Sequence, residues 1–245
     1  MEENYIKHRY EPIIPKKDEW PVVKLARERK EFVKKVAELA EATVLSLIAT
    51  NPDILKEELE TTLYREKLRV KQNPWAVDPD DEGQFWGEVK NSLLQINTDS
   101  GLSKVKRQEA YQGVLKRISS RYAEEIASNF KASHYKFTRS VVTFGFARLL
   151  NAARVKGFKS IFSNQFTLQD KIQITGHTDQ IRDLATKGTI VMVPTHFSNL
   201  DSILIGWIIS VLGMPPFIYG AGLNLFNISI FAYFMNALGA YKVDR

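Results

Sequence analysis

A histidine and an aspartate stand five residues apart between two apolar segments, in the stretch TIVMVPTHFSNLDSILIGW at residues 189–207. The imidazole of His196 can take up a proton near neutral pH, and the carboxylate of Asp201 can accept a hydrogen bond that fixes the tautomer of the imidazole. This arrangement is typical of a general base. Spacing and placement alone leave a second interpretation equally open, in which His196 is a buried histidine satisfied by a capping interaction.

The elements predicted around this pair would place it at the edge of a sheet. The β-branched run 189–196 predicts a buried strand that ends at His196. The next residues, 199–213, predict a helix whose first turn contains Asp201. Because ligands of open α/β sheets bind at the carboxyl ends of strands, the pair would stand where a substrate is expected.

Residues 172–245 alternate between strand and helix patterns throughout. Strands are predicted at KIQITG, TIVMVPTH, FIYGAG and AYKVDR, with helices between them, the first of which is closed by Gly188. The pattern indicates an α/β domain. Because the last predicted strand reaches Arg245, the final residue, we expect this domain to be truncated and the chain to be a fragment of a longer protein.

The earlier part of the chain has a different character. Residues 22–171 show the apolar spacing of a helical module. Its first helix would run continuously from residue 22 to the Asn51-Pro52 break, Asp53 is a plausible cap of the second helix, and Ser103 stands at the start of a later one. Residues 1–21 are polar, contain acids and lack the apolar core of a secretory signal. We expect this leader to be poorly ordered.

The net charge of +6 is unevenly distributed. From residue 172 onward four basic residues balance four acids, so the whole excess lies in residues 1–171. Such an excess suits an anionic lipid surface or a phosphate-bearing substrate, although an ordinary solvated surface rich in lysine would look the same. Residues 202–241 carry no charge, but Pro215-Pro216 breaks them into pieces shorter than the ~20 residues that cross a bilayer. Contact with one face of a membrane is therefore favoured over spanning it.

Several other functions are disfavoured. The chain has no cysteine, its four histidines are scattered, and the calcium-like loop DPDDEG at 78–83 has Val89 where such a loop needs a glutamate. No glycine-rich phosphate loop occurs, and the basic residues of 103–121 are interleaved with acids in the manner of a solvated helix. We expect no metal, no bound cofactor and no nucleic acid partner.

Three ordered motifs carry a resemblance. PTHFSNLDS resembles the His-x4-Asp block of the glycerolipid acyltransferases, which acylate glycerol 3-phosphate or 1-acylglycerol 3-phosphate. PFIYGAGLNLF resembles a turn of the glycerol-3-phosphate branch, and LGAYKVDR resembles the Gly-x5-Arg block, with Gly239 and Arg245 at the matching positions. The resemblance covers residues 172–245. Together with the helical pattern of residues 22–171, it predicts an α+β chain in which a helical domain at 22–171 precedes the first part of an α/β acyltransferase domain at 172–245.

The resemblance also implies a mechanism. His196 would be the general base and Asp201 would orient it, while Gly239 and Arg245 would contribute to binding the phosphate-bearing acceptor. The acyl donor would be a thioester, either acyl-CoA or acyl-carrier-protein, used as a co-substrate in phospholipid biosynthesis. The protein would lie on the cytoplasmic side of a membrane as a peripheral or monotopic protein. The acceptor is left open among glycerol 3-phosphate, dihydroxyacetone phosphate and lysophosphatidate.

Two departures qualify this interpretation. Thr195 replaces the usual asparagine before the histidine, and the later Glu-Gly-Thr-Arg-like block is missing because the sequence ends at Arg245. We expect this chain alone to be inactive or nearly so. Two alternatives remain: a catalytically inactive, membrane-associated binding protein related to the acyltransferases, and a thioester hydrolase in which His196 activates water.

Overall fold

The computed structural model describes residues 9–48, 52–151, 168, 172–195 and 199–243. These residues form two compact units. The first unit draws on Met1–Arg27, Asn129–Tyr219 and Asn236–Ala240. The second draws on Glu28–Ser128, Gly220–Met235 and Tyr241–Arg245. The division into a leader, a helical domain and an acyltransferase domain stays a prediction.

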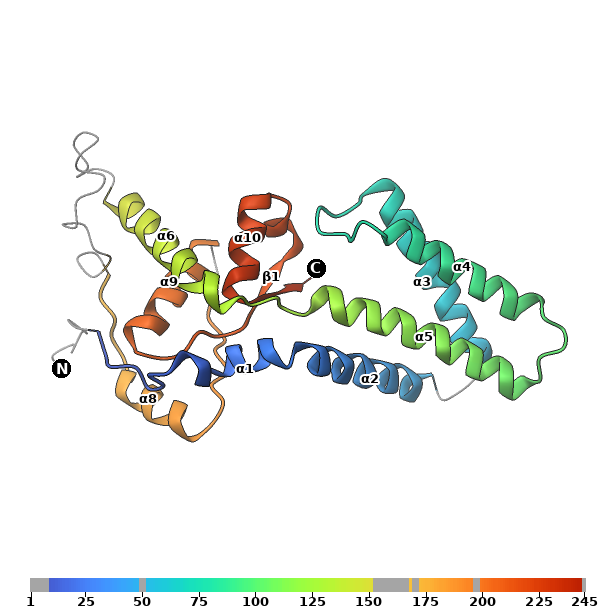
Figure 1. The fold of residues 1–245 in the computed structure, drawn as a ribbon, viewed down its shortest axis with the longest axis horizontal. Coiled ribbons are helices and arrows are strands. Elements are labelled where there is room, and N and C mark those ends of the chain that lie inside the picture. Colours follow the sequence, from blue (N-terminus) through green and yellow to red (C-terminus); the bar gives the residue numbers. More distant parts are fainter. Residues whose placement is uncertain (1–8, 49–51, 152–167, 169–171, 196–198, 244–245) are drawn as a thin grey trace. The chain divides into compact units, whose positions relative to one another are not determined.

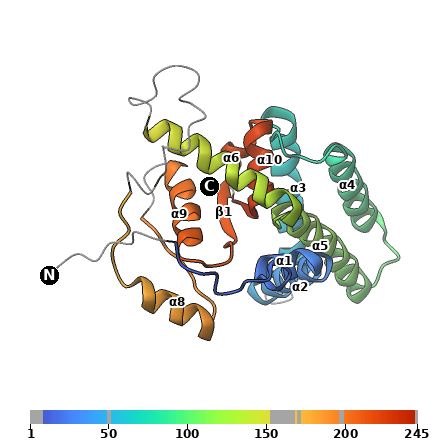
Figure 2. The same ribbon diagram turned by 60° about the vertical axis from the view of Figure 1, so that its left-hand side comes forward.

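The second unit contains a bundle of α2 (Arg29–Leu47), α3 (Pro52–Gln72), α4 (Glu82–Thr98) and α5 (Lys104–Ile126). α5 lies along α2 in both ribbon views and also packs on α3 and α4 (Figures 1 and 2). The apolar residues of α3, α4 and α5 recur at helical spacing, so each helix buries one face. The buried residues of this core are Leu55, Leu59, Trp86, Val89, Leu93, Ile96, Tyr111, Val114, Leu115 and Ile118.

The starts of these helices follow local sequence signals. Ser103 caps α5, as predicted: its side chain accepts a hydrogen bond from the backbone N–H of Lys106 at 3.3 Å. The cap predicted at Asp53 is wrong, because α3 already begins at Pro52 and Asp53 lies inside its first turn. The missing N–H of Pro52 leaves no helical hydrogen bond unmade at this position. The expected continuous first helix is wrong, because α1 (Pro21–Arg27) ends before α2 begins. The break at Glu28 coincides with the boundary between the two compact units.

The first unit is built around α6 (Ala132–Leu150), α8 (Thr178–Lys187) and α9 (Asn199–Val211). α6 and α9 pack together (Figure 2). Phe146 of α6 and Trp207 of α9 belong to one apolar cluster. A second cluster joins α9 to α8 through Ile209 and Ile181. The apolar sequence of α9 after Asp201 is explained by this burial in two clusters. Gly188 follows the end of α8, as predicted.

The leader is more ordered than expected. The backbone N–H groups of Tyr10 and Ile13 donate to the carbonyls of Val211 and Gly213, each at 2.8 Å. The side chains of Tyr10 and Ile13 pack on the cluster beside α9. A short 3-10 helix, η1, follows at Lys17–Glu19. The expectation of poor order is wrong for residues 9–20, because their few apolar side chains find a surface to cover.

The sheet is smaller than expected. β1 (Tyr219–Gly222) pairs with β2 (Ala240–Val243), and η3 (Leu223–Phe226) and α10 (Ser229–Leu238) connect them. These two strands confirm the predictions at FIYGAG and AYKVDR. Residues 172–175 and 189–195 are irregular, so the strands predicted at 171–176 and 189–196 are wrong for the described residues. A strand is held by a neighbouring strand, and the described part of the chain offers these two segments none. The result is a mostly helical chain with a small sheet, consistent with the α+β class.

The apolar stretch 202–241 divides between α9, β1, η3 and α10. Within the described ranges, no helix combines the length and the apolar composition needed to cross a bilayer.

Candidate functional site

Asp201 lies in the first turn of α9, as predicted. The positive end of the helix dipole favours a carboxylate at this position. Downstream in the same helix, Trp207 and Val211 are buried, so the turn that carries Asp201 is anchored by the apolar core. His196 lies outside the described residues. Its hydrogen bond with Asp201 and its role as a base therefore stay predictions.

Gly239 has a conformational role that the sequence did not reveal. It joins α10 to β2 with φ +88°, a backbone conformation that residues with a side chain rarely adopt. Its N–H donates to the Asn236 carbonyl at 3.1 Å. A Cβ at this position would stand 3.3 Å from Phe130 Cδ2. Glycine therefore allows the chain to leave α10 and enter β2, while its contribution to acceptor binding stays a prediction. Arg245 lies outside the described residues.

Gly220 allows the two strands of the sheet to approach closely. A Cβ on Gly220 would lie 3.1 Å from the ring of Tyr241 and from Val243 Cγ2. Both of these residues belong to β2, two residues apart on one face of the strand. The glycine of the second family-like motif is thus needed to seat the strand that precedes Arg245.

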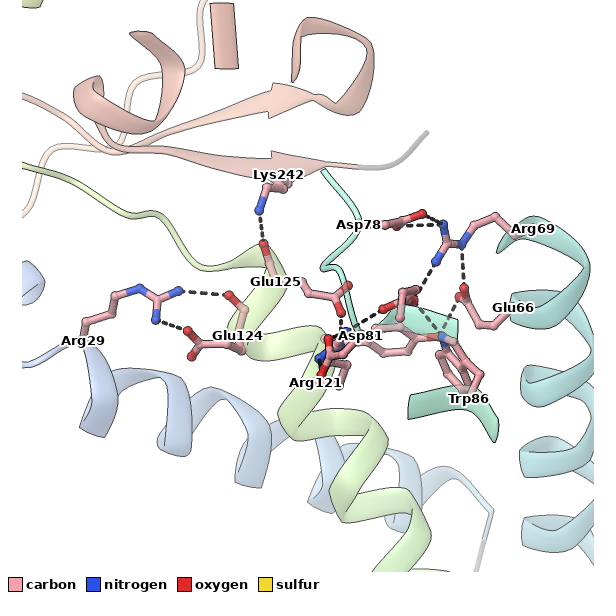
Figure 3. Close-up of polar contacts among 12 residues, drawn as sticks. Arg29, Glu66, Arg69, Asp78, Asp81, Trp86, Arg121, Glu124, Glu125 and Lys242 are labelled. Carbon is pink, nitrogen blue, oxygen red and sulfur yellow. Dashed lines mark hydrogen bonds and ion pairs between the residues drawn. The ribbon is translucent and has the colours of Figure 1, made fainter. Parts of the chain in front are cut away.

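A cluster of charged side chains joins α3, α4 and α5, and the sequence did not predict it (Figure 3). We call it the charge cluster; its members are Glu66, Arg69, Asp78, Asp81, Glu82, Arg121 and Glu125. Arg69 donates to Glu66 at 2.6 Å, to both oxygens of Asp78 at 2.8 and 2.9 Å, and to Glu82 at 2.9 Å. Although burial acts in the opposite direction, the hydrogen bonds to Asp78 and Glu66 hold the pKa of Arg69 above its usual value. Arg69 is therefore a permanent cation that fixes three carboxylates.

Arg121 is the second cation of the charge cluster. It lies 2.8 Å from Asp81, 2.8 Å from Glu82 and 2.5 Å from Glu125. Burial, reinforced by the neighbouring Glu82, raises the pKa of Glu125 to about 7. The charge cluster thus contains two guanidinium groups and five carboxyl groups, and one of these carboxyl groups, that of Glu125, binds a proton near neutral pH. The buried indole of Trp86 also donates to Glu82 at 2.7 Å, which ties the charge cluster to the apolar core.

The charge cluster is a structural network in its present geometry. Its arginines bridge helices, and its carboxylates accept hydrogen bonds from Trp86 and from the hydroxyl of Tyr122, which lies 2.7 Å from Glu66. Among the described residues, no group of three histidine, aspartate or glutamate side chains is arranged to hold a metal ion. The chemistry available here is proton uptake by Glu125.

Lys242 of β2 is a further residue that the sequence did not single out. Its ammonium group donates to the backbone carbonyl of Glu125 at 2.7 Å, at the end of α5 (Figure 3). One signal could have found it: Lys242 is the first charged residue after Asp201, at the end of a 40-residue uncharged stretch. A single cation beside so much apolar sequence needs an acceptor.

Comparison with known proteins places the predicted site within a family match. The acyltransferase family model matches residues 171–245, a range that includes His196, Asp201, Gly239 and Arg245. A glycerol-3-phosphate acyltransferase of Pseudomonas paraeruginosa (strain DSM 24068 / PA7) is 26% identical over 128 residues, which cover 52% of this chain and 13% of that protein. One from Shewanella sp. (strain ANA-3) is 26% identical over 165 residues, which cover 66% of this chain and 17% of that protein. No solved structure matches significantly.

The chain thus spans less than a fifth of the length of these relatives. Both aligned stretches are longer than the family match, so the similarity also includes residues before 171. The sequence motifs alone placed the resemblance at 172–245.

Proposed function

We propose that this protein moves a fatty acyl group from a thioester to a hydroxyl of glycerol 3-phosphate, because residues 171–245 match the acyltransferase family model and the chain is similar to glycerol-3-phosphate acyltransferases. The observation that carries the proposal is the coincidence of the family match with three ordered motifs, which hold His196, Asp201, Gly239 and Arg245. The names of the two relatives favour glycerol 3-phosphate over a lysophospholipid as acceptor. The reaction would serve phospholipid biosynthesis.

His196 removes the proton from the acceptor hydroxyl as the oxygen attacks the thioester carbonyl. The C–O bond forms, the C–S bond breaks, and the proton held by His196 passes to the departing thiolate. Asp201 orients the imidazole and stabilises its charged form. Such general-base assistance contributes about 10²–10⁴ in rate. The position of Asp201 in the first turn of α9 supports this assignment. Later residues of α9 are buried in the core, so the helix holds the backbone of Asp201 in a fixed position.

Arg245 binds the phosphate of the acceptor, because a guanidinium can donate two parallel hydrogen bonds to phosphate oxygens. Gly239 sets the backbone path that leads into this block. The donor is a long-chain acyl-CoA or an acyl-carrier-protein. In both cases the thiol leaves with the proton, and no metal or bound cofactor takes part.

The protein works on the cytoplasmic side of a membrane, as a peripheral or monotopic protein. The charge of residues 129–169 supports this placement, since they contain seven lysines and arginines and no acid. In α6, which lies within that range, Phe137 is 62% exposed and Phe144 is 41% exposed. Exposed aromatic residues beside basic ones suit contact with an anionic lipid surface, into which the acylated product can pass.

The test is thiol release from a long-chain acyl-CoA by the full-length protein, with no acceptor, with glycerol 3-phosphate or with lysophosphatidate. We expect release that requires glycerol 3-phosphate and falls by about 10²–10⁴ in His196→Ala. His177→Ala is the matched control, because His177 is exposed at the start of α8. It should leave turnover unchanged.

Release without any acceptor would identify a thioester hydrolase instead. Full activity in His196→Ala would contradict the role of His196 as base. The same assay is repeated with an acyl-carrier-protein donor. Absence of release with both donors would favour the binding-protein alternative.

A further inference from the structure

The end of α5 carries charges of the wrong sign for a helix C-terminus. Its last turn contains Glu124 and Glu125 and no basic residue, whereas the helix dipole favours cations at this position. The last backbone carbonyls also have no partner within the helix. α5 therefore depends on cations from other parts of the chain.

Two cations meet at this helix end (Figure 3). Arg29, at the start of α2, donates to the carbonyl of Glu124 at 2.9 Å and to the carbonyl of Ser128 at 3.0 Å. Lys242 donates to the carbonyl of Glu125 at 2.7 Å. The two cations thus bind neighbouring carbonyls, but they come from different places: Arg29 from within the bundle and Lys242 from β2.

Two groups hold the Lys242 ammonium in place: the backbone carbonyl of Glu125 and the ring of Phe226. The Glu125 carbonyl is backbone, so its position is set by α5 rather than by a flexible side chain. The Lys242 ammonium lies 6.0 Å from the centre of the Phe226 ring, which favours a cation. Burial lowers the pKa of Lys242. An ammonium group that has lost water must keep a strong acceptor, and the Glu125 carbonyl is that acceptor.

We propose that Lys242 is a positioning residue for acyl transfer: it fixes β2, the described part of the Gly-x5-Arg block, on the end of α5. This inference rests on the proposed function, in which Arg245 binds the acceptor phosphate. Only two residues of sequence lie between Lys242 and Arg245, so we expect acceptor binding to respond to the position of β2.

In this proposal the bundle of α2–α5 supports acceptor binding, because α5 holds β2 through Lys242. The similarity to glycerol-3-phosphate acyltransferases that includes residues before 171 agrees with this. Gly220 contributes to the same arrangement, since it lets β1 pack closely against β2.

The test compares Lys242→Met, Lys242→Arg and Arg29→Met in the full-length protein by steady-state kinetics. We expect Lys242→Met to raise KM for glycerol 3-phosphate about tenfold, since small displacements of a binding group are costly. KM for the acyl donor should change less than about twofold. Lys242→Arg should restore most of the acceptor KM, because a guanidinium can reach the same carbonyl. Arg29→Met is the matched control: it removes a cation from the same helix end without touching β2, and it should leave the acceptor KM unchanged.

Hydrogen exchange gives a second readout that does not depend on activity. Lys242→Met should speed exchange of the β2 amides, and Arg29→Met should not. An unchanged acceptor KM in Lys242→Met would overturn the proposal. An equal rise in Arg29→Met would overturn it too, since loss of α5 stability would then explain both results. Wild-type protein without acceptor-dependent turnover would refute the proposed function itself, and with it the positioning role of Lys242.

Discussion

The bundle of α2–α5 and the segment from residue 172 to 243 are stabilised by different kinds of contact. The bundle buries one face of each helix and places a network of ion pairs beside its apolar core. The later segment carries no charge from residue 202 to residue 241, and it packs α9 into two apolar clusters. Polar contacts therefore define geometry in the bundle, whereas apolar contacts and glycines define it in the later segment.

This difference matters for how each region depends on its surroundings. A helix satisfies its own backbone, so the bundle needs only side-chain contacts between helices. A strand satisfies its backbone through a neighbour. β1 and β2 have each other, while residues 189–195 are β-branched but unpaired among the described residues.

The largest effect is expected in the charge cluster. Arg121→Met should lower the free energy of unfolding by about 3 kcal/mol, because it leaves Glu125 without its cation and the buried Glu82 with Arg69 alone. Arg117→Met is the control. Arg117 pairs with Glu88 on the surface, with both side chains more than 40% exposed, so the loss should stay below about 1 kcal/mol. Urea unfolding measures both, and equal losses would show that the charge cluster is not a buried network.

An intermediate effect is expected at Gly239. Gly239→Ala should lower the free energy of unfolding by about 1–3 kcal/mol, since it forces a positive φ on a residue with a Cβ. Gly206→Ala tests the opposite case. Gly206 is exposed inside α9 with open space at its Cβ position, so alanine should stabilise the protein by about 0.5–1 kcal/mol. Chemical denaturation of the two variants should give shifts of opposite sign. Shifts of the same sign would contradict the conformational role of Gly239.

The smallest effect is expected in the pH dependence of stability. The pKa of Glu125 is raised from 4.5 to about 7 by burial, so the folded protein holds this proton at a pH where the unfolded chain has lost it. Its contribution to stability is therefore greatest below pH 4.5, falls as the pH rises towards 7 and is constant above. Glu125→Gln should remove this slope and gain about 1 kcal/mol at pH 8 relative to pH 5, after allowing for partial solvent exposure. Urea midpoints measured across this range would show identical slopes in both proteins if Glu125 does not carry the proton.

The sequence predicted well those elements whose signals are local. Ser103 begins α5, Gly188 follows α8, and Asp201 lies in the first turn of α9, because caps and apolar spacing act within a few residues. β1 and β2 were also found, since turns and glycines bound them.

The sequence failed where the outcome depends on distant partners. The run at 189–196 has the composition of a strand, but composition does not supply the neighbour that a strand requires. The leader was expected to be poorly ordered because the sequence does not show which apolar surface its few apolar residues will pack on. In the fold they pack on the cluster beside α9. The charge cluster and Lys242 were missed for the same reason: Arg69 and Asp78, or Lys242 and Glu125, become neighbours only after the chain has folded. Of the predicted site, Asp201 and Gly239 could be located, while the roles of all four residues stay predictions.

The open stretch around Val191 and Val193 has a consequence for handling the protein. These side chains are 81% and 88% exposed, and their stretch, TIVMV, has no charge to keep copies apart. Unpaired β-branched segments of this kind template edge-to-edge association and aggregation in concentrated solution. Pro194, which cannot donate to a ladder of backbone hydrogen bonds, limits how far such pairing extends. Solubility should therefore respond to a single lysine placed at position 191 more strongly than to one placed on the already charged surface of the bundle.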